Sequence, residues 1–159
     1  MASRRRQKDE RRRERAAQQP NVRDEEAFRR RIEDTHGKRF VPASPGQEKM
    51  SDVLEAFVDP YVNETATHAD LVKLYGVAVA AWNLALFPPD QQRAALDQTL
   101  HNVLPGASRD DVEFLRRFVE DLVARKNLLF PDNRRAIIAF ELLESENGDP
   151  YLQVASTLA

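Results

Sequence analysis

The chain has 159 residues, a length that fits one ordinary domain with an extension better than two domains. It contains no cysteine, which excludes disulfides, thiolate metal sites and cysteine nucleophiles and agrees with a reducing compartment. Residues 1–50 contain fifteen Lys or Arg against nine Asp or Glu, a net charge of +6, whereas residues 51–159 contain nine against seventeen, a net charge of −8. The sequence therefore indicates a basic extension joined to an acidic domain.

The first residues lack the pattern of a secretory signal. Such a signal needs an apolar segment directly after its basic start, but Arg6 is followed by Gln7, Lys8, Asp9 and Glu10. We therefore expect a cytoplasmic protein.

Residues 1–19 are rich in charge and contain no Leu, Ile, Val, Phe, Tyr or Trp. A helix there would have no apolar face to bury, so we expect it to be marginal and to end before Pro20. Phosphate contacts need only Lys or Arg side chains, so this arm is a candidate for non-specific nucleic-acid binding; the alternative is a solvated segment that keeps the protein soluble. The candidate nucleic-acid-binding residues are Arg4, Arg5, Arg6, Lys8, Arg11, Arg12, Arg13 and Arg15.

The next segment, residues 21–36, predicts a better helix. Acidic residues in its first turn and arginines further along match the helix dipole, and Phe28 and Ile32 form one small apolar patch. Residues 36–46 contain two prolines and two glycines without periodicity, which is typical of a linker. We therefore divide the chain into a basic extension with its linker, residues 1–46, and a domain, residues 47–159.

Four helices are expected in this domain from apolar residues that recur at helical spacing. The first ends near Asp59 because Pro60 disfavours helical geometry before it. The second starts at a cap-like Thr67 and contains the longest apolar run, residues 74–87, which is shorter than the ~20 residues needed to cross a bilayer and therefore predicts a buried core helix. The third follows Pro88 and ends at Pro105–Gly106, and the fourth starts at a cap-like Ser108 with Phe114 and Phe118 beside its apolar stripe.

The last segment has the pattern of a β-hairpin. Residues 136–144 and 151–157 flank Asn147–Gly148, the strongest short-range hairpin signal. A two-stranded hairpin is marginal alone and must pack on other elements. The expected fold is therefore α+β: a mainly helical domain of about four helices followed by a C-terminal β-hairpin, with a basic, partly helical N-terminal extension.

Sequence motifs give little indication of catalysis. The chain has no P-loop, dinucleotide-binding fingerprint or nucleophile elbow. Asp97 and His101 lie four residues apart on the expected third helix, a spacing that two metal ligands could use, but two ligands are too few for a site. We assign no catalytic, cofactor-binding or metal-binding residue.

The segment from Arg31 to His36, RIEDTH, resembles the spacing of arginine and histidine in HEPN-type ribonucleases, whose fold is helical. The resemblance covers these six residues alone and implies catalytic roles for Arg31 and His36. One such pair is expected roughly 0.36 times by chance in a chain with this many arginines. The pair also lies outside the expected core, next to Gly37.

Trp82 and Asn83 are the two unusual residues of the expected central helix. Either could line a ligand pocket. Buried Trp and Asn side chains more often form hydrogen bonds within the fold, so we interpret both as structural.

The function that needs only visible features is that of a small non-enzymatic interaction or adaptor protein, which uses the helical domain and the hairpin for contacts with another protein or in a homodimer. The first alternative is non-specific nucleic-acid binding through the basic arm, and the second is an unrecognised enzyme such as a helical ribonuclease. We expect no cofactor and no membrane partner. The candidate interface residues are Ile138, Phe140, Leu142, Leu152 and Val154.

Overall fold

A computed structural model describes residues 22–36 and 46–159, with side chains at residues 25–35 and 46–159. The chain divides into two compact units, Met1–Lys38 and Arg39–Ala159, which are described separately. The division falls inside the linker expected at residues 36–46. The expected α+β class is confirmed: the described residues form five helices and a C-terminal two-stranded antiparallel hairpin.

The described part of the first unit is helix α2, Val22–His36, as predicted. Its side chains between residues 25 and 35 are exposed except for Phe28 and Ile32, which lie four residues apart on one face. Arg29 and Glu33 form an exposed ion pair with a nitrogen–oxygen distance of 3.1 Å. The helix is therefore strongly polar with one small apolar face.

The second unit contains the four expected helices and one short 3₁₀ helix. They are α3 (Met50–Val58), η1 (Asp59–Tyr61), α4 (His68–Leu84), α5 (Pro89–Val103) and α6 (Arg109–Leu129). No helix among the described residues is long and apolar enough to cross a membrane. The apolar run predicted as a buried core helix lies mostly in α4, which ends three residues earlier than expected.

Both predicted helix caps are present. The Thr67 hydroxyl accepts a hydrogen bond from the Asp70 backbone N–H at 3.2 Å, and the Asp70 carboxylate accepts one from the Thr67 backbone N–H at 2.9 Å. These hydrogen bonds lower the pKa of Asp70, because they stabilise its ionised form. At the start of α6, the Ser108 hydroxyl accepts from the Asp111 backbone N–H at 3.2 Å.

The hairpin consists of β1 (Arg135–Glu144) and β2 (Pro150–Leu158). The expected turn is present: the Gly148 backbone N–H donates to the Ser145 carbonyl at 2.8 Å, and Gly148 adopts a φ of +79°, which favours glycine. A bulge at Ile138 shifts the register, so that Ile137 pairs with Ser156 while Ala139 pairs with Ala155. Because side chains alternate along a strand, the bulge sets which residues of β1 face the helices.

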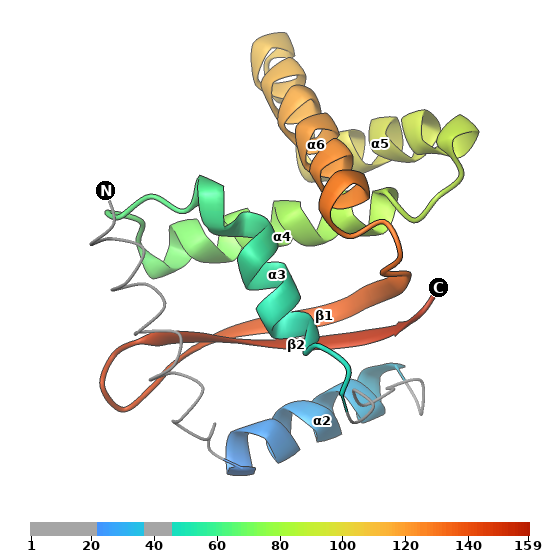
Figure 1. Ribbon diagram of the computed structural model, residues 1–159. Coiled ribbons are helices and arrows are strands. Elements are labelled where there is room, and N and C mark those ends of the chain that lie inside the picture. The colour runs from blue at the N-terminus through green and yellow to red at the C-terminus, as the bar shows by residue number, and fades with distance from the viewer. Residues whose placement is uncertain (1–21, 37–45) are drawn as a thin grey trace, which may run out of the picture. The chain divides into compact units, whose positions relative to one another are not determined.

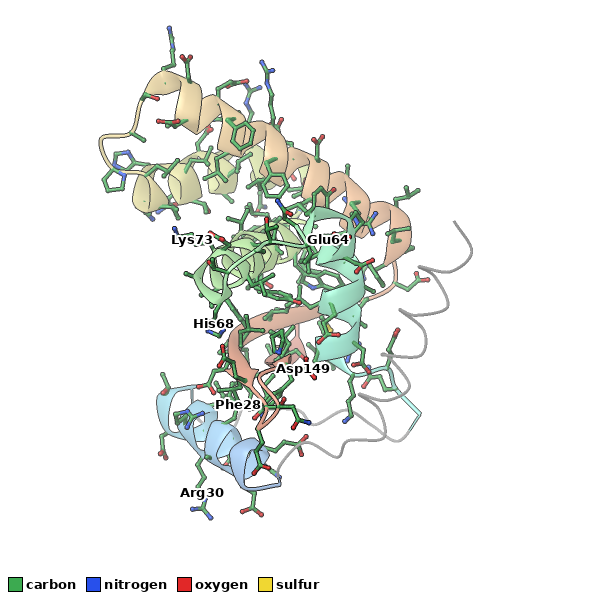
Figure 2. The ribbon with its side chains drawn as sticks, turned by 90° about the vertical axis from the view of Figure 1, so that its left-hand side faces the viewer. Phe28, Arg30, Glu64, His68, Lys73 and Asp149 are labelled. Atoms are coloured by element: carbon green, nitrogen blue, oxygen red, sulfur yellow. The ribbon has the colours of Figure 1, made fainter. Side chains whose placement is uncertain are left out.

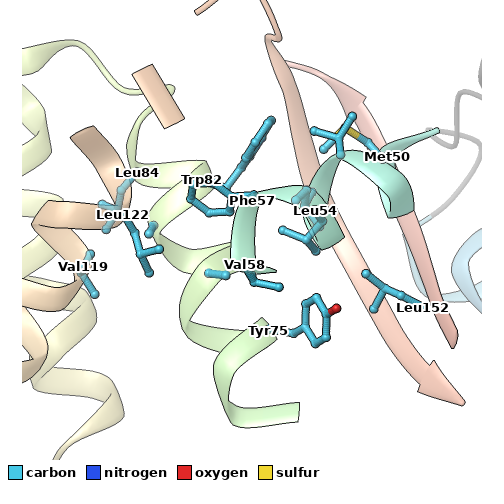
Figure 3. Close-up of a cluster of buried hydrophobic side chains, with 14 of the residues drawn as sticks. Met50, Leu54, Phe57, Val58, Tyr75, Trp82, Leu84, Val119, Leu122 and Leu152 are labelled. Carbon is cyan, nitrogen blue, oxygen red and sulfur yellow. The ribbon is translucent and has the colours of Figure 1, made fainter. Parts of the chain in front are cut away.

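The core lies between the hairpin and helices α3, α4 and α6 (Figure 1). Helix α3 packs on β2 and helix α4 packs on β1, so the two helices cover one face of the hairpin. Trp82 is fully buried at the centre, with its ring edge-on to the ring of Phe57 at a centroid distance of 5.4 Å. Figure 3 shows these two aromatic rings beside Leu54, Val58 and Leu122.

Helices α5 and α6 lie on the side of α4 that is opposite the hairpin (Figure 1). The Arg116 guanidinium on α6 reaches the Asp97 carboxylate on α5, with a nitrogen–oxygen distance of 2.6 Å. Buried Leu96 and Leu100 of α5 complete this part of the core.

Candidate interaction surface

The outer edge of strand β1 is capped at Ile137 by a side chain of α4. The Asn83 amide nitrogen donates to the Ile137 carbonyl, and the Asn83 amide oxygen accepts from the Ile137 backbone N–H, both at 2.9 Å. An amide that offers one donor and one acceptor in this way replaces the backbone of a neighbouring strand. Two residues earlier, the Trp82 indole N–H donates to the Arg135 carbonyl at 2.8 Å. The start of β1 is therefore closed to a further strand.

This arrangement confirms the structural interpretation of Trp82 and Asn83. Neither residue lines the hollow that the second unit contains near the start of α4. The specific role of Asn83 was not predicted, since its partner lies 54 residues further along the chain. The available signal was one amide within an otherwise apolar helix.

No further strand among the described residues pairs with the outer edge of β1 or of β2. The two edges differ because Asn83 and Trp82 form hydrogen bonds with the backbone at the start of β1. The sheet has the two strands β1 and β2 alone within these residues. Unpaired N–H and C=O groups along an edge are a template for an added strand. The two edges of the hairpin are therefore not equivalent.

Four of the predicted interface residues face the helices. Leu152 belongs to the core, and Phe140, Leu142 and Val154 are partly buried against it. Ile138 lies at the bulge, where the register of the hairpin changes. In the structure these side chains contribute to the core and to the strand register. An interface role for them stays a prediction.

The opposite face of the hairpin follows from the alternation of side chains along each strand. Glu141 and Gln153 form one cross-strand pair on this face, and Leu143 and Tyr151 form the next. The side-chain amide of Gln153 has no hydrogen-bond partner among the described residues. Gln153 is buried, with an exposed fraction of 8%, so its amide is an unsatisfied polar group of the interior, and such a group costs free energy.

Lys126 lies in the core, with an exposed fraction of 2%. Its ammonium group lies over the Trp82 ring, 5.3 Å from the ring centroid, an arrangement that favours the charged form. Burial and the nearby Arg134 nevertheless lower the pKa of Lys126 below its ordinary value, because both disfavour the charged form. Within the described residues Lys126 therefore contacts an aromatic ring of the core, and we interpret it as a residue of the fold.

The other candidate residues do not converge into a site. Asp97 pairs with Arg116, and His101 is exposed on the same helix. No cluster of three or more potential metal ligands exists within the described residues. Arg31 lies on α2 with its side chain described, whereas the side chain of His36 lies outside the described residues, so the resemblance of this pair to ribonucleases stays untested.

His68 at the start of α4 lies next to the hairpin, as Figure 2 shows, with its Nδ1 atom 3.8 Å from a carboxylate oxygen of Glu144. Both side chains are exposed, which limits the contribution of this pair to stability.

The arm residues predicted to bind nucleic acid, Arg4 to Arg15, lie outside the described residues. Comparisons of the chain with protein-family models, curated proteins and solved structures found no match. Only the chemistry of the described surfaces therefore indicates a function.

Proposed function

We propose that the chain is a non-enzymatic protein-interaction module that adds a strand of a partner to the outer edge of β2. The observation that carries this proposal is the difference between the two edges: Asn83 and Trp82 occupy the backbone groups at the start of β1, whereas the sheet ends at β2 with no third strand among the described residues. Proteins usually protect edges that must not pair, so an edge without protection is suited to binding.

The simplest partner is strand β2 of a second copy. Two antiparallel β2 strands would form a continuous four-stranded sheet with a two-fold axis between the copies. Such a sheet would leave the β1 strands at its two outer edges, where Asn83 blocks the addition of a further strand at the start of β1. The arrangement therefore favours a closed dimer over an open fibre.

Sedimentation velocity over a range of protein concentrations tests this homodimer. Gln153→Lys places a charge at the middle of β2, where two copies would bring like charges together. Because Gln153 is buried, with an exposed fraction of 8%, circular dichroism must first verify that the variant is folded. Glu141→Lys is the matched control, because Glu141 pairs with Gln153 but lies one strand, about 4.8 Å, further from the β2 edge. We expect Gln153→Lys to weaken self-association by about tenfold or more, which corresponds to about 1.4 kcal/mol, and the control to weaken it less.

Amide hydrogen exchange tests the edge difference without a partner. In dilute protein the Ile137 N–H should exchange slowly, because Asn83 accepts its hydrogen bond. Alternate amides of β2 should exchange faster. A monomer in which every amide of β2 exchanges as slowly as Ile137 would contradict the proposal.

Non-specific nucleic-acid binding through the arm remains the alternative function. Its test compares binding of a labelled random oligonucleotide at two salt concentrations by the full chain and by a chain that starts at Gly46. Arm-dependent binding should weaken linearly in log affinity with log salt concentration. Equal binding by both chains would exclude the arm from nucleic-acid recognition.

A further inference from the structure

Helix α6 and the short helix η1 carry aromatic side chains at the surface of the second unit. The Phe114 side chain on α6 is 74% exposed. Phe118 lies one turn further along the same helix, and its ring meets the Tyr61 ring edge-on at a centroid distance of 5.3 Å. We call Phe114, Phe118 and Tyr61 the aromatic face. The apolar surface of the exposed Phe114 ring leaves water only when a partner covers it.

The aromatic face continues into a small hollow. Tyr61 also lines this hollow, whose volume is about 220 Å³. Leu71 and Leu74 of α4 form its apolar wall, and Asn63, Thr65 and Asp70 form its polar part. Pockets for drug-sized ligands usually have volumes of about 300–1,000 Å³, so this hollow is small for such a ligand. It is suited to one apolar side chain of a protein partner that also covers the aromatic face.

Acidic side chains beside the aromatic face lack an ion pair among the described residues, whereas Arg125 on the same side of α6 donates to the Phe57 and Ala56 carbonyls. Asp110 lies one turn before Phe114 and Asp121 lies two turns after it, on the same side of α6. Neither carboxylate has an ion-pair partner among the described residues, nor does Glu64, which lies between Asn63 and Thr65, two residues that line the hollow. Arg117 on this side of the helix is already paired with Glu113, at 3.1 Å.

We infer that the aromatic face and the hollow bind a basic amphipathic helix of a partner protein. One apolar side chain of that helix enters the hollow beside Leu71, and the next two, at i+4 and i+7, cover Phe118 and Phe114. Lys or Arg side chains along its flanks pair with Asp110, Asp121 and Glu64. A second copy of this face is an unsuitable partner, because it would bring the same unpaired carboxylates together.

This inference is independent of the hairpin. The aromatic face lies on η1 and α6, and the wall of the hollow lies on α4, whereas strand addition uses β2. The two surfaces can therefore be tested separately, and the failure of one proposal does not contradict the other.

The test uses the full chain and a fluorescent synthetic helix whose leucines follow the i, i+4, i+7 pattern, with lysines at the other positions. We expect saturable binding that weakens as salt concentration rises. Phe114→Ala should weaken binding by about tenfold or more, because it removes the exposed anchor of the face. Its high exposure keeps the cost to folding small, and circular dichroism would verify the fold.

Leu128→Ala is the matched control for Phe114→Ala. Leu128 lies on the same helix, is 79% exposed, and stands fourteen residues, about 21 Å along the helix axis, from Phe114. The control and Gln153→Lys should both bind the synthetic helix like the parent protein. The double variant Asp110→Asn, Asp121→Asn should weaken binding at low salt and reduce its salt dependence.

Two results would overturn the inference. The first is an absence of saturable binding to the parent protein at low salt. The second is equal affinity of the parent protein and Phe114→Ala for the synthetic helix, which would mean that the peptide attaches to the acidic domain through charge alone.

Discussion

The junction between α4 and β1 and the junction between α5 and α6 are held by different chemistry. In the first, two side chains of α4 form partly buried hydrogen bonds with the backbone of β1, 53 and 54 residues away. In the second, the ion pair between Asp97 and Arg116 is partly open to water, with Asp97 54% exposed. Removing one partner of the first kind leaves groups unsatisfied in the interior, whereas removing one partner of the second exposes a charge that water can solvate.

The largest effect is expected for Trp82→Ala. The substitution removes a fully buried ring and its hydrogen bond to the Arg135 carbonyl, so the free energy of unfolding should fall by about 3–5 kcal/mol. Urea denaturation followed by circular dichroism measures this change. In the parent protein, tryptophan fluorescence with a maximum like that of indole in water would contradict the burial on which the expectation depends.

Asn83→Ala tests the edge cap directly. It leaves the N–H and the C=O of Ile137 without partners, so the free energy of unfolding should fall by about 2–4 kcal/mol. The freed edge of β1 should also increase self-association at high protein concentration. Asn102→Ala on the exposed end of α5 is the control and should change neither quantity. Unchanged stability of Asn83→Ala would show that the two hydrogen bonds are dispensable.

These two residues also mark how far the sequence predicts the fold. The caps at Thr67 and Ser108 and the turn at Gly148 were predictable because each depends on residues within about four positions. The pairing of Asn83 with Ile137 was not, because it depends on how α4 and β1 pack. The alternation of apolar residues along the hairpin likewise identifies two faces without indicating which one the helices cover.

The candidate surfaces were predicted less well than the fold for the same reason. Phe114 and Phe118 were expected beside the apolar stripe of their helix, but their exposure differs because η1 covers only part of α6. Tyr61 lies 57 residues before Phe118 in the sequence, and no local pattern predicts their contact. Surfaces assembled from distant segments require the packing of the whole domain.

Lys126→Met gives a smaller effect and sharpens the comparison, because Lys126 is a buried charge on α6 whose ammonium group lies over the Trp82 ring of the first region. The lowered pKa means that the unfolded chain binds a proton more tightly than the folded chain does at this residue. The charged Lys126 therefore lowers the free energy of unfolding. This cost is fully present below the pKa of Lys126 in the folded protein and is lost as pH rises toward 10.5, the ordinary pKa of a lysine. We expect Lys126→Met to stabilise the protein by up to about 1 kcal/mol at low pH within the stable range, and the difference from the parent to shrink on the alkaline side. Urea denaturation at several pH values measures it; a difference that grows with pH would contradict the sign.

The smallest effect is expected for the second region. Asp97→Asn keeps the shape of the side chain and removes its charge, so Arg116 keeps a hydrogen-bond acceptor and its weaker pairing with Glu113, at 3.9 Å. Because Asp97 is largely exposed, the free energy of unfolding should fall by about 0.5 kcal/mol at physiological salt. High salt screens the pair, so the difference between parent and variant should shrink in about 1 M salt, where the screening length is about 3 Å. Urea denaturation at both salt concentrations measures the change. Two outcomes would contradict this expectation: a loss of unfolding free energy as large as that of Asn83→Ala, or a loss that high salt does not reduce. Either would mean that the contact between α5 and α6 depends on its ion pair as strongly as the contact between α4 and β1 depends on its hydrogen bonds.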